Sequence, residues 1–167
     1  MIDMRSLTLV MAATTLAAQC PDSSEAGLPS ASDVAGYYAS DRGLEATVNG
    51  NVATIYVAQS AQQLRRGGAL WAKVGPYVFL FTDETQQLLT DYPGLAGVRV
   101  VTRVGEAEVA NALLLRNELN DVLWRRAKNI AGQARRDGTE RVRLLEELVA
   151  WGEAHTEFEY NSRYTRR

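Results

Sequence analysis

Cysteine and histidine are almost missing from this chain of 167 residues, which contains one of each, Cys20 and His155. A single cysteine excludes a disulfide framework within the chain and any cysteine-rich metal site. A single histidine removes most sites in which imidazole side chains serve as catalytic bases or metal ligands. The sequence also lacks glycine-rich nucleotide-binding loops and the Gly-x-Ser-x-Gly motif of serine hydrolases. It therefore predicts no cofactor and no familiar catalytic site.

An excess of charge of one sign is lacking as well, because 18 Lys and Arg stand against 20 Asp and Glu, for a net charge of −2. This balance gives no reason to expect binding to nucleic acid or to an anionic membrane surface. Hydrophobic residues make up 46% of the chain, which is enough for a packed core in one domain of ordinary size.

The first twenty residues have the layout of a bacterial export signal. Arg5 precedes an apolar stretch from Leu7 to Ala18. One basic residue followed by about a dozen apolar or small residues is typical of a secretory signal peptide. The stretch is too short to cross a bilayer, which requires roughly 20 apolar residues. We therefore expect residues 1–19 to be removed during export.

The end of this stretch, Leu16-Ala-Ala-Gln-Cys20, resembles the lipobox of bacterial lipoproteins. The resemblance covers only the N-terminal eighth of the chain, and Gln19 stands where Gly, Ala or Ser is usual. It implies that Cys20 becomes the first mature residue and carries acyl chains, which would anchor the protein on the periplasmic side of a bacterial membrane. Ordinary cleavage after Ala17 is the alternative and would give a soluble periplasmic protein. Residues 20–33, rich in Ser, Pro and Gly, are then a flexible tether.

The mature part, residues 34–167, is expected to form one α+β domain whose first section, 34–104, is rich in strands. Two alternating segments, 44–48 and 52–57, flank Asn49-Gly50, a pair typical of the type I′ turn of a β-hairpin. A short helix follows over 58–64. The continuous apolar run at 77–81 favours a buried central strand. Asp83 is placed to cap a helix that ends at about Tyr92, and 98–104 is another strand.

The second section, residues 105–153, predicts a long antiparallel helical hairpin. Apolar residues recur at steps of three and four from Glu106 to about Arg136, and charged residues fill the opposite face. Asp137-Gly138 ends this first helix, and Thr139 is placed to cap the second. Residues 156–160 could return as a strand, followed by a basic tail. The predicted fold is thus a small antiparallel or mixed sheet with short helices, followed by a long C-terminal α-helical hairpin.

The most suggestive polar cluster lies at residues 153–159, where Glu153, His155, Glu157 and Glu159 alternate with other residues. If this stretch is extended, the four side chains share one face, because side chains alternate along a strand. Carboxylates and an imidazole on one face can bind a divalent metal ion. The simpler interpretation is a strand face exposed to solvent. A single histidine is weak evidence for a metal site over this alternative.

A second cluster is basic and lies toward the end of the first predicted helix. It can contact lipid headgroups or an acidic partner protein, or it can be a solvated face that complements the negative C-terminal end of that helix. Its members are Arg125, Arg126, Lys128, Arg135 and Arg136.

Three function classes follow from these features. The first is a non-catalytic accessory or structural subunit, anchored through Cys20 and docked on a membrane protein complex such as a respiratory or photosynthetic one. The second is a metal-binding or hydrolytic enzyme module centred on His155. The third is a periplasmic protein that binds a small ligand in a pocket between the sheet and the helical hairpin.

Overall fold

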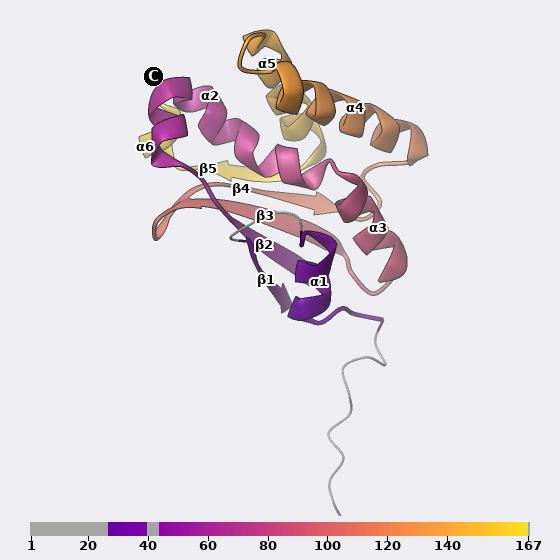
Figure 1. Cartoon of the computed structure of the whole chain (residues 1–167). Coiled ribbons are helices and arrows are strands. Elements are labelled where there is room, and N and C mark those ends of the chain that lie inside the picture. Colours follow the sequence, from indigo (N-terminus) through magenta and orange to yellow (C-terminus); the bar gives the residue numbers. More distant parts are fainter. Residues whose placement is uncertain (1–26, 40–43, 167) are drawn as a thin grey trace, which may run out of the picture.

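Five β-strands form one mixed sheet in the computed structural model, which describes residues 27–39 and 44–166 (Figure 1). The strands lie in the order β1 (Leu44–Asn49), β2 (Val52–Ala58), β3 (Gly97–Val104), β4 (Ala107–Leu115) and β5 (Glu157–Tyr160). Neighbours are antiparallel except β2 and β3, which are parallel. The predicted signal peptide and Cys20 lie outside the described residues. The protein is thus a mixed α/β fold, with six helices in the part that the structure describes.

The predicted hairpin at β1 and β2 is confirmed, with Leu44 opposite Val57 and Asn49 opposite Val52. The turn differs in detail from the expected type I′ turn. The loop consists of Gly50 and Asn51, and only Gly50 has a positive φ, of 57°. Glycine at the first loop position accepts this conformation without steric cost, which is the preference of type II′ turns.

Two helices connect the parallel strands β2 and β3. They are α2 (Ala61–Leu80), which is interrupted at Gly68 by a non-helical conformation, and α3 (Asp83–Asp91). The helix predicted at 58–64 is present from Ala61 onward, but it continues beyond the interruption at Gly68 as far as Leu80. The prediction of a strand at 77–81 is wrong, because residues 77–80 are the end of this helix. A short apolar run does not distinguish a buried helix from a buried strand, and here Tyr77 and Leu80 are wholly buried helical residues. The helix predicted at 83–92 is confirmed, but its N-cap is Thr82 rather than Asp83.

Strand β4 replaces the first half of the predicted long helix. Residues 107–115 pair with β3 through a two-residue turn that begins with Gly105, whose φ is 57°. Alanine, leucine and glutamate in this segment favour a helix, but pairing with β3 on one side and β5 on the other outweighs that preference. The first helix of the predicted hairpin, α4 (Asp121–Asp137), therefore begins at Asp121 instead of Glu106.

The helical hairpin is present in part. Helix α4 ends at Gly138, as predicted, and α5 (Val142–His155) follows after a short turn and packs against it. Arg141 rather than Thr139 is the N-cap of α5, and its side chain makes no capping hydrogen bond. The predicted C-terminal strand is β5, and a short helix, α6 (Ser162–Thr165), follows it.

Helices α2 to α5 lie on one side of the sheet, as Figure 1 shows, and the core lies between them and the strands. The cross-strand neighbours Ile55, Val100 and Ala112 point into this core and are wholly buried. The remaining helix, α1 (Ala31–Tyr37), packs beside β1 and reaches α3 through the hydrogen bond between Tyr38 and Thr85. Within residues 27–39 and 44–166, no helix has the length and hydrophobicity needed to span a bilayer.

Candidate functional site

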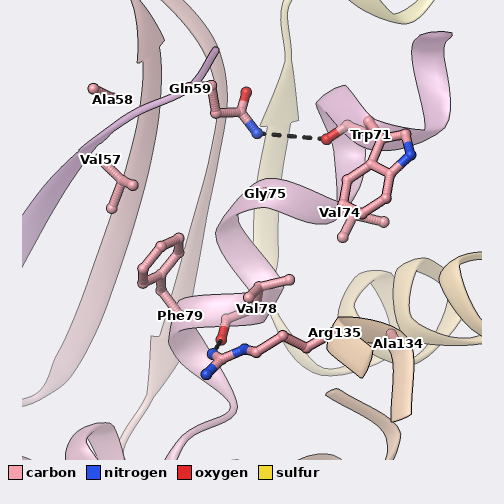
Figure 2. Close-up of a pocket in the computed structure, with 10 residues that line it drawn as sticks. All are labelled: Val57, Ala58, Gln59, Trp71, Val74, Gly75, Val78, Phe79, Ala134 and Arg135. Atoms are coloured by element: carbon pink, nitrogen blue, oxygen red, sulfur yellow. Dashed lines mark hydrogen bonds between the residues drawn. The ribbon is translucent and has the colours of Figure 1, made fainter. Parts of the chain in front are cut away.

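A pocket of about 290 Å³ opens between the C-terminal end of β2, helix α2 and the last turns of α4 (Figure 2). Its size lies near the lower limit of about 300–1,000 Å³ for small-molecule sites in proteins. Residues from all three elements line it: Val57, Ala58, Gln59, Trp71, Val74, Gly75, Val78, Phe79, Ala134 and Arg135.

Most of the pocket wall is apolar. Val57 lies on the helix-facing side of β2, in register with the buried Thr102 of β3. Val74 and Val78 are one helical turn apart on α2, so both present their side chains toward the same side. Figure 2 shows Trp71 next to Val74 and Phe79 next to Val78, so these two aromatic side chains extend the wall. Apolar walls with a few polar groups are the usual composition of ligand pockets.

Gln59 is one of two polar side chains in the lining. Its backbone N–H donates to Arg103 O at 2.7 Å, and its Nε2 donates to Trp71 O at 3.4 Å. The amide rests directly on helix α2, because a Cβ added at Gly75 would lie 2.2 Å from Gln59 Nε2. Its Oε1 is buried and accepts no hydrogen bond from any residue that the structure describes. An unsatisfied buried acceptor costs about 1–3 kcal/mol, so this oxygen is a place where a donor would be favourable.

Arg135 is the second polar group and lies at the rim. Figure 2 shows its side chain reaching from α4 to α2, where Nη2 donates to Val78 O at 2.7 Å. Val78 is in the last turn of α2, whose carbonyls have no partners within the helix. This contact uses one of the five N–H donors of the guanidinium, and the described residues provide no carboxylate partner for it.

A half-buried polar network joins α2 to α5 and β5. The hydroxyls of Tyr77 and Tyr160 are 2.6 Å apart, and Lys73 Nζ lies 3.4 Å from Glu153 Oε1 and 4.8 Å from the centre of the Tyr160 ring. Burial raises the pKa of Tyr77, and burial together with the hydrogen bond to Tyr77 raises the pKa of Tyr160. Both phenols therefore stay protonated at neutral pH and serve to hold the two helices and the strand together.

The structure does not assemble the metal site that the sequence suggested. Residues 153–155 are the end of helix α5 rather than part of an extended strand, so Glu153 and His155 leave the helix in different directions. Glu153 pairs with Lys73, while His155 Nδ1 lies 3.4 Å from Glu118 Oε1. Only Glu157 and Glu159 lie on strand β5. Among the described residues, no group of three or more His, Cys, Asp or Glu side chains could hold a metal ion.

The predicted basic cluster is divided among different contacts. Lys128 forms an ion pair with Asp83 and a hydrogen bond to Gln86, so it ties α4 to α3. The Arg126 guanidinium carbon lies 4.7 Å from the centre of the Trp151 ring, on α5. Arg135 belongs to the pocket. Arg125 and Arg136 are exposed and form no ion pair with any residue that the structure describes.

Sequence reasoning proposed a pocket between the sheet and the helical hairpin but did not identify its residues. Gln59 and Trp71 had no distinctive signal, because each becomes part of the pocket only through the kinked path of α2. Gly75 lies inside helix α2, just before the apolar run at 77–81, in residues that did not indicate a helix. The one feature of the sequence that indicated a pocket residue was the basic end of α4, which contains Arg135. No protein-family model, curated protein or solved structure matches the chain.

Proposed function

We propose that this protein is a non-catalytic binding protein of the bacterial envelope that holds a small apolar ligand in the pocket between β2, α2 and α4. The observation that carries this proposal is the pocket itself, with its apolar wall and its two polar side chains.

The lining favours binding over catalysis. Nucleophilic catalysis requires a Ser, Thr, Cys or Lys near a base, and general acid–base catalysis requires a group that titrates near neutral pH. The ten lining residues include none of these groups. The two polar side chains are an amide, which does not ionise, and a guanidinium, which stays protonated.

The position of Gly27, the first residue that the structure describes, supports a membrane tether that leaves the pocket accessible. Gly27 O accepts a hydrogen bond from Gly94 N, in the loop before β3, and this loop adjoins the turn where β2 begins. The pocket lies at the other end of β2. Seven peptide steps separate Cys20 from Gly27, a reach of at most about 25 Å. An acyl anchor at Cys20 would hold the Gly94 end of the sheet toward the membrane and the pocket away from it.

The test is whether a small molecule accompanies the protein from its native envelope. We expect mass spectrometry of an organic extract of the purified protein to find a bound compound in a ratio approaching one per chain. Val57→Trp, which directs an indole ring from the helix-facing side of β2 into the pocket, should remove it. Ala150→Trp, at an exposed position of α5, should retain it. An extract with no bound compound, or equal amounts in the two variants, contradicts the proposal.

Docking on a larger membrane complex, the first role predicted from the sequence, is the second candidate. The observation in its favour is the pair Arg125 and Arg136, which are exposed on α4 without an ion-pair partner in the described part of the chain. Purification from membranes in mild detergent tests it. A stable complex that dissociates in the double variant Arg125→Gln/Arg136→Gln supports this role, and a free monomer refutes it.

A further inference from the structure

The rim of the pocket carries a cation whose position is fixed in advance. The Arg135 guanidinium is held against α2 by its hydrogen bond to Val78 O, and the aliphatic part of its side chain crosses the space between the two helices (Figure 2). A guanidinium that is already positioned loses less conformational entropy when it binds a further group. Its remaining N–H groups can donate two parallel hydrogen bonds to the two oxygens of a carboxylate, which is the geometry that arginine prefers.

The charge of Arg135 is not cancelled by a neighbouring carboxylate. Asp83 and Glu84 line a second hollow together with Arg135. Asp83 pairs there with Lys128, two helical turns before Arg135 on α4, and neither carboxylate forms an ion pair with Arg135. Within the described residues, Arg135 has no ion-pair partner. The pocket therefore combines an arginine that forms no ion pair with the described residues, at its mouth, with an apolar interior.

We infer that the ligand is a small carboxylic acid whose carboxylate binds Arg135 and whose apolar body fills the space lined by Val57, Trp71 and Val74. This inference rests on the proposed binding function and names its ligand class. A volume of about 290 Å³ holds a molecule of about ten non-hydrogen atoms, if each takes about the 30 Å³ that a water molecule occupies in the liquid.

Three probes with the same apolar body and different head charges test the inference. They are 3-phenylpropanoate, 3-phenylpropanamide and 3-phenylpropan-1-amine, each titrated calorimetrically into the mature protein in mild detergent, with the detergent-only titration subtracted. A charge-assisted hydrogen bond favours the carboxylate, so we expect it to bind at least about ten-fold more tightly than the amide, and the amine to bind most weakly.

Substitutions at two adjacent arginines assign the effect to one side chain. Arg135→Gln should bring the affinities of carboxylate and amide to within about two-fold, because the charge is gone. Arg135→Lys should retain part of the preference for the carboxylate over the amide, since lysine keeps the positive charge but lacks the planar set of N–H donors of a guanidinium. Arg136→Gln is the matched control on the same helix turn, outside the pocket lining, and should preserve the full preference.

The outcomes separate the ligand class from the proposed function. If all three probes bind equally and Val57→Trp blocks them, the carboxylate inference is overturned and the binding function stands. A carboxylate preference that survives in Arg135→Gln also overturns the inference. Failure of every probe to bind, in a protein whose native extract contains no small molecule, overturns both.

Discussion

Replacement of Gly152 by alanine tests how closely α5 must approach α2. An added Cβ would lie 2.4 Å from Cδ1 and Cε1 of Tyr77, well inside the 3.5–4.0 Å at which carbon atoms attract each other most. The Tyr77 ring cannot move aside easily, because it is wholly buried, stacks on Phe81 with centroids 6.0 Å apart, and is hydrogen-bonded to Tyr160.

The expected magnitude follows from two opposing effects. Alanine is favoured over glycine inside a helix by about 0.5–1 kcal/mol. Overpacking of a filled core costs about 1–3 kcal/mol, so we expect Gly152→Ala to lower the free energy of unfolding by about 1–2 kcal/mol. Gly132→Ala is the matched control in α4, because its added Cβ meets only the tip of Arg136 at 3.9 Å. It should raise the free energy of unfolding by about 0.5–1 kcal/mol.

Urea unfolding followed by circular dichroism measures both variants against the native protein. Equal stabilisation by the two substitutions would refute the close approach of α5 to Tyr77. It would also weaken the account of the pocket, because the α2 helix that forms its wall is positioned by this contact.

Three further predictions concern other contacts. Gly75→Ala should lower the free energy of unfolding by about 1–3 kcal/mol, because its Cβ would lie 2.9 Å from Cγ2 of the wholly buried Thr102. It should also abolish ligand binding, because the Gln59 amide, with Nε2 at 2.2 Å from that Cβ, would have to move within the pocket lining; retained binding in calorimetry contradicts this. Tyr37 donates to Asp91, which raises its pKa from 10.0 to about 12, so its contribution to stability should be complete below pH 10 and decline as the pH rises to 12. A stability difference between native protein and Tyr37→Phe that does not change over this interval would refute that coupling. Arg116 donates to three backbone carbonyls between the last turn of α3 and the start of β3. Arg116→Met should therefore lower the free energy of unfolding in urea by about 3 kcal/mol, and a decrease of less than about 1 kcal/mol would contradict this.

Local sequence signals were sufficient to predict secondary structure where apolar and polar residues alternate or where the sequence contains a clear turn. Such signals predict the hairpin around Gly50, the helix over 83–91 and the strand over 97–104. Residues within or next to each of these elements indicate where it begins and ends. The strand at 157–160 was also predicted, although the helix before it extends as far as His155.

The errors occurred where tertiary packing decides between helix and strand. The segment containing Tyr77 has the composition of a strand, but it lies in a helix covered by the sheet on one side and α5 on the other. The segment 107–115 has the composition of a helix, but strand pairing with β3 and β5 fixes it. Both depend on partners distant in the sequence, which periodicity does not reveal.

The candidate site was unpredictable for a related reason. Gln59, Gly75 and Arg135 are separated along the chain and meet only because α2 crosses back over the sheet and α4 lies against it. The sequence identified Arg135 as part of a basic cluster, yet its neighbours Arg126 and Lys128 serve quite different contacts. Charge alone therefore could not single out the arginine at the pocket.

The central claim is that the pocket holds a small ligand, and the difference between two masses of the same sample tests it most directly. The protein is purified from its own membrane in mild detergent, and its mass is measured under native and then under denaturing conditions. We expect a native mass that exceeds the denatured mass by one small molecule, and no excess in Val57→Trp. A denatured chain that begins at Cys20 with added acyl mass would also confirm the anchor. Identical native and denatured masses would contradict the claim.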